Sequence, residues 1–157
     1  MTLKPIPEAL PLITPHLVVH DAAAAIAFYG AALGAREIYR MLGPDGRRVL
    51  FSELMIGDAR LFVVDEFPEQ NALSPRSLGG SPVTLHIYLE DVDAAYARAV
   101  AAGMTIEIPL ADFFWGERYG TLHDPFGHRW GLASRIEDLS PSDIQERARA
   151  FYGKNRS

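Results

Sequence analysis

The amino-acid sequence predicts an α+β fold made of two copies of one βαβββ module. The spacing that separates His16 from His86 also separates Asp21 from Asp91. Each His lies in a stretch where apolar and polar residues alternate, and each Asp stands where a helix cap belongs. Because a repeat at fixed spacing indicates a repeated structural unit, we interpret the two halves as copies of one module.

The elements of the first copy follow from its periodicity. Alternation predicts a strand at 13–20, and the carboxylate of Asp21 can cap a helix over about 22–33. Gly34 is a suitable stop for that helix, and turn residues separate the strands that follow. These strands are expected near 36–41, 48–56 and 59–65.

The second copy repeats this order. In the strand at 83–90, alternation places Thr84, His86 and Tyr88 opposite an all-apolar face. A helix over about 92–102 comes next. The remaining strands are expected near 105–108, 118–123 and 128–134, the last two joined by the turn Asp124-Pro125-Phe126-Gly127.

We expect a single domain over residues 1–157. Its expected parts are module one at about 10–65, a connector at 66–81, module two at about 82–135 and a C-terminal helix at about 140–152. The connector is rich in Pro, Gly and Ser, which favours a loop. Ser140 and Pro141 suit the cap and the first position of the C-terminal helix.

Composition narrows the possible functions. Apolar residues make up 48% of the chain and charged residues 22%, which is typical of a globular domain. The absence of cysteine excludes disulfides and thiol nucleophiles. A net charge of −5 without a basic cluster argues against nucleic acid, and no apolar stretch is long enough for a membrane span. We therefore expect a cytoplasmic protein with a small-molecule ligand.

The repeated module, the helix AFYGAALGA and the turn DPFGHRW resemble the vicinal-oxygen-chelate superfamily. This group holds glyoxalase I, extradiol dioxygenases, fosfomycin-resistance enzymes and bleomycin-resistance proteins. Within it, stretches such as TPHLVVHDAAAAIAFY and DPFGHRWGLASRIEDLSP look most like the PhnB-type proteins. The similarity extends from about residue 4 to about residue 145. It implies two modules that form a curved mixed sheet around a cavity, usually in a homodimer.

Metal-dependent members of this superfamily place a His, Gln or Glu on the first strand of each module and a Glu on the last. Matching the helices, the DPFG turn and the repeat puts the four positions at Thr14, Leu61, Thr84 and Gly131. None of these residues is a good ligand for zinc, nickel, iron or manganese. We therefore expect no metal and no other cofactor.

Two histidines leave a non-standard metal site as an alternative. His16 and His86 come two residues after Thr14 and Thr84, so the period of a strand points them to the same side. With help from the carboxylate of Glu53 they could hold a metal. The simpler interpretation is that they are polar residues lining the cavity, because no third ligand is evident.

An acid–base pair is a further candidate for chemistry. Glu53 lies mid-strand in VLFSELMIG on the expected cavity face, and the repeat matches it with His123. Such a pair could move a proton next to a substrate carbonyl. The alternative is that Glu53 makes a structural hydrogen bond to a histidine or an arginine.

Residues 111–120, ADFFWGERYG, crowd aromatic side chains around a glycine-flanked loop. Trp115, Arg118 and Tyr119 together suit a planar or apolar ligand that carries an anionic or carbonyl group. We expect these three side chains to close the mouth of the cavity. A hydrophobic plug or a dimer contact is the alternative.

The sequence therefore favours a metal-free protein that binds a small aromatic or amphipathic molecule. The expected ligand-binding residues are His16, Glu53, His86, Trp115, Arg118, Tyr119 and His123. The alternative is a lyase or isomerase that uses Glu53 with His86 or His123, either metal-free or with a non-standard divalent metal. The sequence does not decide between these two functions.

Overall fold

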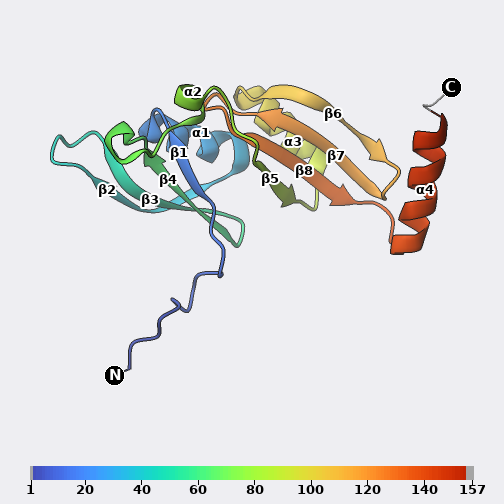
Figure 1. Ribbon diagram of the computed structural model, residues 1–157, viewed down its shortest axis with the longest axis horizontal. Helices are drawn as coiled ribbons and strands as arrows, with labels where there is room; N and C mark the ends of the chain where they lie inside the picture. The colour runs from blue at the N-terminus through green and yellow to red at the C-terminus, as the bar shows by residue number, and fades with distance from the viewer. Residues whose placement is uncertain (1, 155–157) are drawn as a thin grey trace. The chain divides into compact units, whose positions relative to one another are not determined.

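The computed structural model describes residues 2–154 and divides into two compact units, the first ending at Ser81 and the second beginning at Pro82 (Figure 1). Each unit contains one module. Among the described residues, no helix is long and apolar enough to cross a membrane.

The first unit is a four-stranded mixed sheet with a helix against one face. Its elements are β1 (His16–Val19), α1 (Ala22–Leu33), β2 (Arg36–Leu42), β3 (Val49–Ile56) and β4 (Ala59–Asp65). The strand order is β1-β4-β3-β2, with β1 parallel to β4 and the other pairs antiparallel. The expected connector is partly helical, with η1 (Pro68–Gln70) and α2 (Pro75–Leu78).

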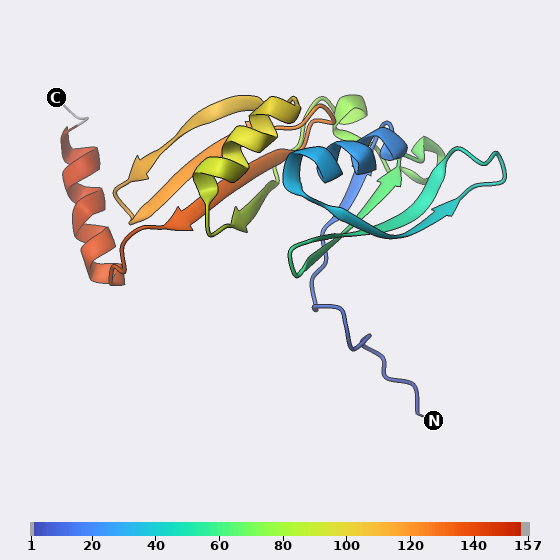
Figure 2. The ribbon, with the colours of Figure 1, turned by 180° about the vertical axis from the view of Figure 1, so that it is seen from behind.

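The second unit has the same architecture. Its elements are β5 (Thr84–Tyr88), α3 (Val92–Ala102), β6 (Thr105–Phe113), β7 (Glu117–His123), β8 (Arg129–Arg135) and α4 (Pro141–Lys154). The strand order β5-β8-β7-β6 and the single parallel pair repeat those of the first sheet. Figure 2 shows α1 and α3 lying against one face of their respective sheets. This repetition confirms the α+β fold with two βαβββ modules and a C-terminal helix.

The helices α1 and α3 begin and end at the capping residues that the sequence predicts. Asp21 Oδ1 accepts a hydrogen bond from the Ala24 amide at 3.0 Å, and Asp91 Oδ1 accepts one from the Ala94 amide at the same distance. Each carboxylate thereby satisfies an amide that the first helical turn leaves unpaired. Gly34 ends α1 in the left-handed conformation, with φ of 68°.

The core of the second unit lies between α3 and its sheet. Leu122, Leu132 and Trp130 are almost completely buried there. The Trp130 indole donates a hydrogen bond to Asp124 Oδ2 at 2.8 Å. The other oxygen of Asp124 accepts from the Phe126 amide at 2.9 Å, so one carboxylate ties the turn between β7 and β8 to the core.

The structure corrects the register that a constant repeat spacing predicts. His16 lies opposite Phe62, whereas His86 lies opposite Gly131. The counterpart of Gly131 is therefore Phe62 and not Leu61, which is only 4% exposed. The shift arises in part because α3, with 11 residues, is one residue shorter than the 12-residue α1.

The same shift changes the expected match of Glu53. Glu53 lies opposite Phe62, and the residue opposite Gly131 is Thr121. Glu53 therefore corresponds to Thr121 rather than to His123. The turn between β7 and β8 is longer than the turn between β3 and β4, and a spacing taken from sequence alone does not include this difference.

A hydrogen-bond cluster around Glu66 holds the connector to the first sheet. The Glu66 carboxylate accepts hydrogen bonds from the Ser74 amide at 2.8 Å and from the Ser77 hydroxyl at 2.7 Å. These bonds favour the ionised carboxylate and lower the pKa of Glu66 from 4.5 to about 2, with Ser74 as the main cause. Ser74 is fully buried. Glu66 therefore anchors the loop that follows β4.

We expect Glu66→Gln to destabilise the protein at neutral pH and to have less effect in acid. Because the pKa of Glu66 is lowered on folding, its contribution is fully present above the unfolded value of 4.5 and is lost as pH falls toward about 2. Urea unfolding of both chains between neutral pH and about pH 2 measures this difference. The exposed Glu90→Gln is the control, and a Glu66→Gln effect independent of pH would contradict the expectation.

Candidate functional site

The candidate site lies on the face of the second sheet that α3 does not cover, which we call the open face. A Cβ atom on Gly120 would lie 2.7 Å from Cε2 of Tyr96 in α3, so Gly120 faces that helix. Its neighbour Tyr119 faces the other way, because side chains alternate along a strand. The Tyr119 ring stacks on His86, with centroids 5.6 Å apart. His86 thus lies on the open face, in agreement with the alternation in its strand.

Two rings occupy the space beside Gly131. A Cβ atom on Gly131 would lie 3.1 Å from His86 Nδ1 and 3.1 Å from Tyr119 Cε2. His86 also contacts Tyr88 edge-on, with ring centroids 4.8 Å apart. These contacts are tighter than ordinary van der Waals distances, so a Cβ atom at position 131 would make one or both rings shift.

An aromatic hairpin extends from the stacked pair. Phe113 and Trp115 stack with centroids 4.5 Å apart and planes inclined by 19°. The centroids of both rings lie 5.8 Å from the centroid of the Tyr119 ring, and the ring planes are inclined to it by 74° and 66°. Beyond them, the Phe114 ring contacts Trp115 on one side and Phe151, which belongs to α4, on the other. Both pairs of ring centroids are 5.1 Å apart. The rings form one continuous series from the open face to the C-terminal helix.

The hairpin is tighter than the loop that the sequence predicts. β6 continues to Phe113, which pairs with Glu117 at the start of β7. The turn between them has Gly116 in a left-handed conformation, with φ of 87°. Trp115 therefore lies in the turn, whereas Arg118 and Tyr119 belong to a strand.

The structure does not bring Arg118 together with Trp115 and Tyr119. Arg118 Nε donates to the two carboxylate oxygens of Asp93 at 3.1 and 3.0 Å, and Nη1 donates to Asp112 at 2.9 Å. Asp93 lies in the first turn of α3, so the guanidinium lies on the helix side of the sheet. The hydrogen bond from Arg118 lowers the pKa of Asp93. The Arg118 guanidinium, which was expected at the mouth of a cavity, is thus bound by the carboxylates of Asp93 and Asp112.

A polar cluster lies at the opposite end of β7. Glu107 has no partner in the register between β6 and β7, which marks a bulge. Its carboxylate accepts a hydrogen bond from the Thr121 hydroxyl at 3.2 Å and another from Arg129 Nε, and it lies 3.2 Å from His123 Nε2. Arg129 Nη1 in turn donates to the hydroxyl of Thr84 at 2.9 Å. We call these five residues the Glu107 cluster.

Charge holds this cluster together. The hydrogen bond from Arg129 is the main cause that lowers the pKa of Glu107, with smaller contributions from His123 and Thr121. Glu107 is therefore ionised at neutral pH beside an arginine and a histidine. The arrangement can hold a carbonyl or a carboxylate of a ligand, and it can orient His123 for proton transfer.

Sequence reasoning missed Glu107 and Arg129. Alternation alone gives no sign that a bulge turns Glu107 toward Thr121. The available signal is Pro109, because proline cannot donate to a strand ladder and is found at bulges. The matching bulge in β2, at Ile38, shows that both modules carry this irregularity.

In the first unit, a row of rings runs across the sheet from β1 to β2. His16 meets Phe62 edge-on at 6.0 Å, Phe62 meets Phe51 at 4.8 Å, and Phe51 meets Tyr39 at 6.3 Å between centroids. We call these four residues the aromatic row. Glu53 lies opposite both Tyr39 and Phe62 in the sheet.

Glu53 forms an ion pair with Arg60, and the two side chains are 16% and 21% exposed. This pair corresponds to the structural alternative considered for Glu53. His16 and Glu53 lie in the first unit, whereas His86 and His123 lie in the second. The expectation that all four line one cavity stays a prediction.

The residues at the usual metal positions do not fit a divalent metal. The Thr84 hydroxyl accepts from Arg129, Gly131 offers no side chain, and Phe62 takes the place assigned to Leu61. Thr14 precedes β1. Across residues 2–154, no group of three or more His, Cys, Asp or Glu side chains could hold a metal ion.

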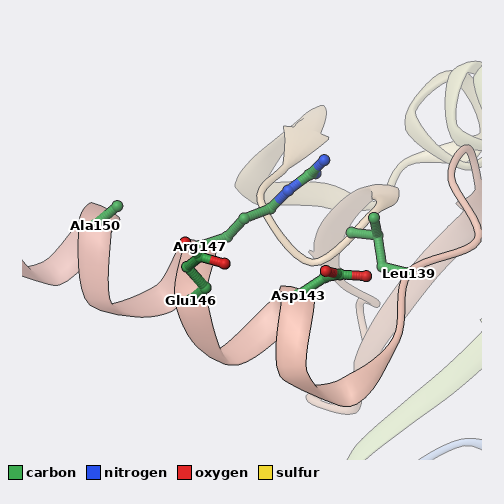
Figure 3. A pocket seen from close by; sticks show the side chains of 5 residues that line it. All are labelled: Leu139, Asp143, Glu146, Arg147 and Ala150. Carbon is green, nitrogen blue, oxygen red and sulfur yellow. The ribbon is translucent and has the colours of Figure 1, made fainter.

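A hollow of about 520 Å³ lies along α4. Figure 3 shows the residues that line it, which are Leu139, Asp143, Glu146, Arg147 and Ala150. Arg147 is held there by Glu137 at 2.8 Å and donates to the Phe114 carbonyl at 3.3 Å. The hollow contains no predicted site residue, and its one cation serves to attach α4.

A second hollow, of about 310 Å³, lies in the first unit. It is lined by His20, Asp21, Asp45, Arg47, Arg48, Asp65 and Glu66. Its carboxylates have structural roles. Asp65 accepts hydrogen bonds from the amides of Ala22 and Val49, both at 2.7 Å, and Asp45 accepts from the amides of its turn.

The fold and the site define a two-module βαβββ protein without the usual metal ligands. The chain belongs to the Glyoxalase/Bleomycin resistance protein/Dioxygenase superfamily, whose family model matches residues 10–132. This match confirms the resemblance that the repeated module and the DPFG turn indicate.

Related proteins share most of the chain. An uncharacterised protein of Mycobacterium tuberculosis is 43% identical over 138 residues, covering 86% of this chain and 81% of its own. The crystal structure of a glyoxalase/bleomycin resistance protein/dioxygenase from Nocardioides superposes with a TM-score of 0.64 at 28% identity, covering 84% of this chain and 88% of its own. A PhnB protein from Bacillus cereus shares the fold, with a TM-score of 0.61 at 17% identity over 79% of this chain and 99% of its own.

Proposed function

We propose that the protein is a metal-free member of its superfamily that binds a small aromatic or amphipathic molecule. The ligand lies on the open face of the second sheet, against His86, Trp115 and Tyr119. The observation that supports this most is the packing beside Gly131, where two stacked rings fill the space of a side chain. Flat rings at this position offer apolar contact, and Gly131 itself has no side chain that could bind a metal.

The polar end of the ligand meets the Glu107 cluster. Arg129 uses Nε for Glu107 and Nη1 for Thr84, and its side chain is 30% exposed. A guanidinium carries five N–H donors, so donors remain for a ligand carbonyl or carboxylate. This arrangement favours a planar ligand with one acceptor group at its end.

Tryptophan fluorescence tests the proposal directly. Trp115 lies beside the expected ligand, whereas Trp130 is 2% exposed in the core and gives a constant background. We expect naphthalene-2-carboxylate to quench Trp115 saturably and cyclohexanecarboxylate to bind about tenfold more weakly, because it lacks a flat ring. Trp115→Phe assigns the signal. Equal affinity for the two probes, or no saturation, would contradict aromatic recognition.

We expect His86→Ala to weaken naphthalene-2-carboxylate binding by about 1–2 kcal/mol, or roughly 5–30-fold. The change removes one ring of the stack and leaves Tyr119 without its partner. Isothermal titration calorimetry measures the affinity. Tyr88→Phe keeps its ring and loses only the hydroxyl that donates to Glu117 at 3.0 Å, so it serves as the control. An unchanged affinity in His86→Ala would place the ligand elsewhere.

A second candidate function is a lyase or isomerase. The specific observation is the 3.2 Å approach of His123 Nε2 to the Glu107 carboxylate, which resembles a base held by an orienting carboxylate. His123 would then remove a proton next to a substrate carbonyl. Loss of the α-proton signals of dihydroxyacetone in D₂O, followed by NMR, tests this reaction. We expect His123→Gln to abolish this hydrogen–deuterium exchange. Exchange that continues in the variant would contradict the enzyme function.

We also propose that the protein is a homodimer. Among residues 2–154, the outer strands of each four-stranded sheet pair on one side only, and free strand edges are commonly covered by a partner. The aromatic hairpin and the connector are the expected contacts. Light scattering at micromolar concentration measures the mass, and a value near the 17.3 kDa of one chain would contradict the dimer.

A further inference from the structure

The segment before β1 exposes apolar side chains. Residues 2–15, which we call the N-terminal arm, form no helix or strand and run away from the first sheet (Figure 1). Its large apolar residues are strongly exposed: Leu3 88%, Ile6 55%, Leu12 85% and Ile13 85%. An exposed apolar stretch of this kind favours burial against another surface.

Four prolines restrict the arm. Pro5, Pro7, Pro11 and Pro15 each fix φ at about −65° and lack an amide hydrogen, so the arm has few accessible backbone conformations. One turn, in which the Leu10 amide donates to the Pro7 carbonyl at 3.2 Å, interrupts its extended course. Restricted segments lose less entropy on binding, and they bind through side chains to aromatic surfaces.

A suitable surface lies on the first sheet. The aromatic row crosses the sheet to Tyr39 in β2, which is an edge strand. The exposed apolar residues of β2 are Ile38 44%, Tyr39 52%, Met41 43% and Leu42 44%. These rings and aliphatic side chains offer the type of surface that a proline-containing apolar segment binds.

We propose that the N-terminal arm of one chain binds the aromatic row and β2 of a second copy. In a single chain both the arm and β2 remain exposed, so each is available to its counterpart in another molecule. The C-terminal end of the arm is fixed to the first sheet, because the Phe62 amide donates a hydrogen bond to the Pro15 carbonyl at 2.8 Å. The residues before Pro15 therefore extend directly from the sheet. The proposal is independent of any ligand on the second sheet.

A labelled arm peptide tests this interaction. The receptor is the full-length Leu12→Ser/Ile13→Ser chain, whose own arm competes less because it has lost two of its apolar side chains. The probe is a fluorescent peptide of residues 2–15. We expect saturable fluorescence anisotropy, and about tenfold or greater loss of affinity when Tyr39→Ser is added to the receptor. Val83→Ser is the matched control, because Val83 is 58% exposed outside the arm, the row, the hairpin and the connector, and it should leave the affinity unchanged.

Three outcomes would overturn the proposal. In the first, the peptide shows no saturable binding to the receptor. In the second, it binds the Tyr39→Ser receptor as tightly as the parent receptor. In the third, wild-type chain fails to bind the peptide at every dilution while the Leu12→Ser/Ile13→Ser chain binds it. That result means that the arm occupies its own sheet rather than the sheet of a second copy.

Discussion

Gly120→Ala is expected to destabilise the protein by about 3 kcal/mol. The added Cβ atom would lie 2.7 Å from Tyr96 Cε2, 2.9 Å from the Ile108 carbonyl oxygen and 3.1 Å from the Leu110 Cα. Two of these three neighbours are backbone atoms of β6. Tyr96 is itself fixed, since its hydroxyl donates to the Ile108 carbonyl at 3.0 Å. The methyl group can therefore be placed only by moving α3 or β6 away from β7.

Urea unfolding measures this effect. The matched control is Gly30→Ala in α1, where the nearest neighbour of the added Cβ is the Ala35 carbonyl oxygen at 3.4 Å. Alanine is favoured over glycine inside a helix by about 0.5–1 kcal/mol, so this variant should be as stable as wild type or slightly more stable. Equal stability of the two variants would contradict the close packing of α3 on β7.

Tyr119→Ala is expected to weaken naphthalene-2-carboxylate binding by about 2 kcal/mol, or roughly 30-fold. Tyr119 contacts His86, Phe113 and Trp115, so its removal takes away the ring that connects the others. Isothermal titration calorimetry gives the affinity, and circular dichroism checks that the fold is retained.

Tyr152→Ala provides a matched tyrosine control for this prediction. Tyr152 is 62% exposed on α4 and contacts only the far end of the ring series, at Phe114 and Phe151. Its variant should bind the probe with unchanged affinity. A Tyr119→Ala variant that binds like wild type would show that the open face of the second sheet is not the binding surface.

Much of the fold could be predicted because local chemistry determines it. Asp21 and Asp91 cap the two helices, and the expected bounds of 22–33 and 92–102 are those of α1 and α3. The alternation around His86 depends only on strand geometry, and the stack on Tyr119 agrees with it. These features need no knowledge of distant residues.

The register between strands could not be predicted in the same way. A constant repeat spacing assigned Leu61 and His123 to positions that belong to Phe62 and Thr121. Turn lengths and helix lengths differ between the modules, and a shift of one residue moves a side chain to the other face of the sheet. Sequence spacing does not report such differences.

The polar contacts of the site depend on tertiary structure as well. Arg118 was expected beside Tyr119, but Asp93 of α3 binds its guanidinium on the helix side. Glu107 joins Arg129 and His123 only because a bulge in β6 leaves it outside the strand register. In both cases the partner comes from an element distant in the sequence, and residue type alone does not identify it.

Metal content measured on the same sample that binds the probe tests the central claim most directly. The purified protein is dialysed mildly, divided, and treated with or without EDTA before elemental analysis and titration with naphthalene-2-carboxylate. We expect only substoichiometric divalent metal and the same affinity in both portions, because Gly131 and Thr84 offer no metal ligand set. One equivalent of metal per chain, with loss of probe binding after EDTA, would contradict a metal-free binding site.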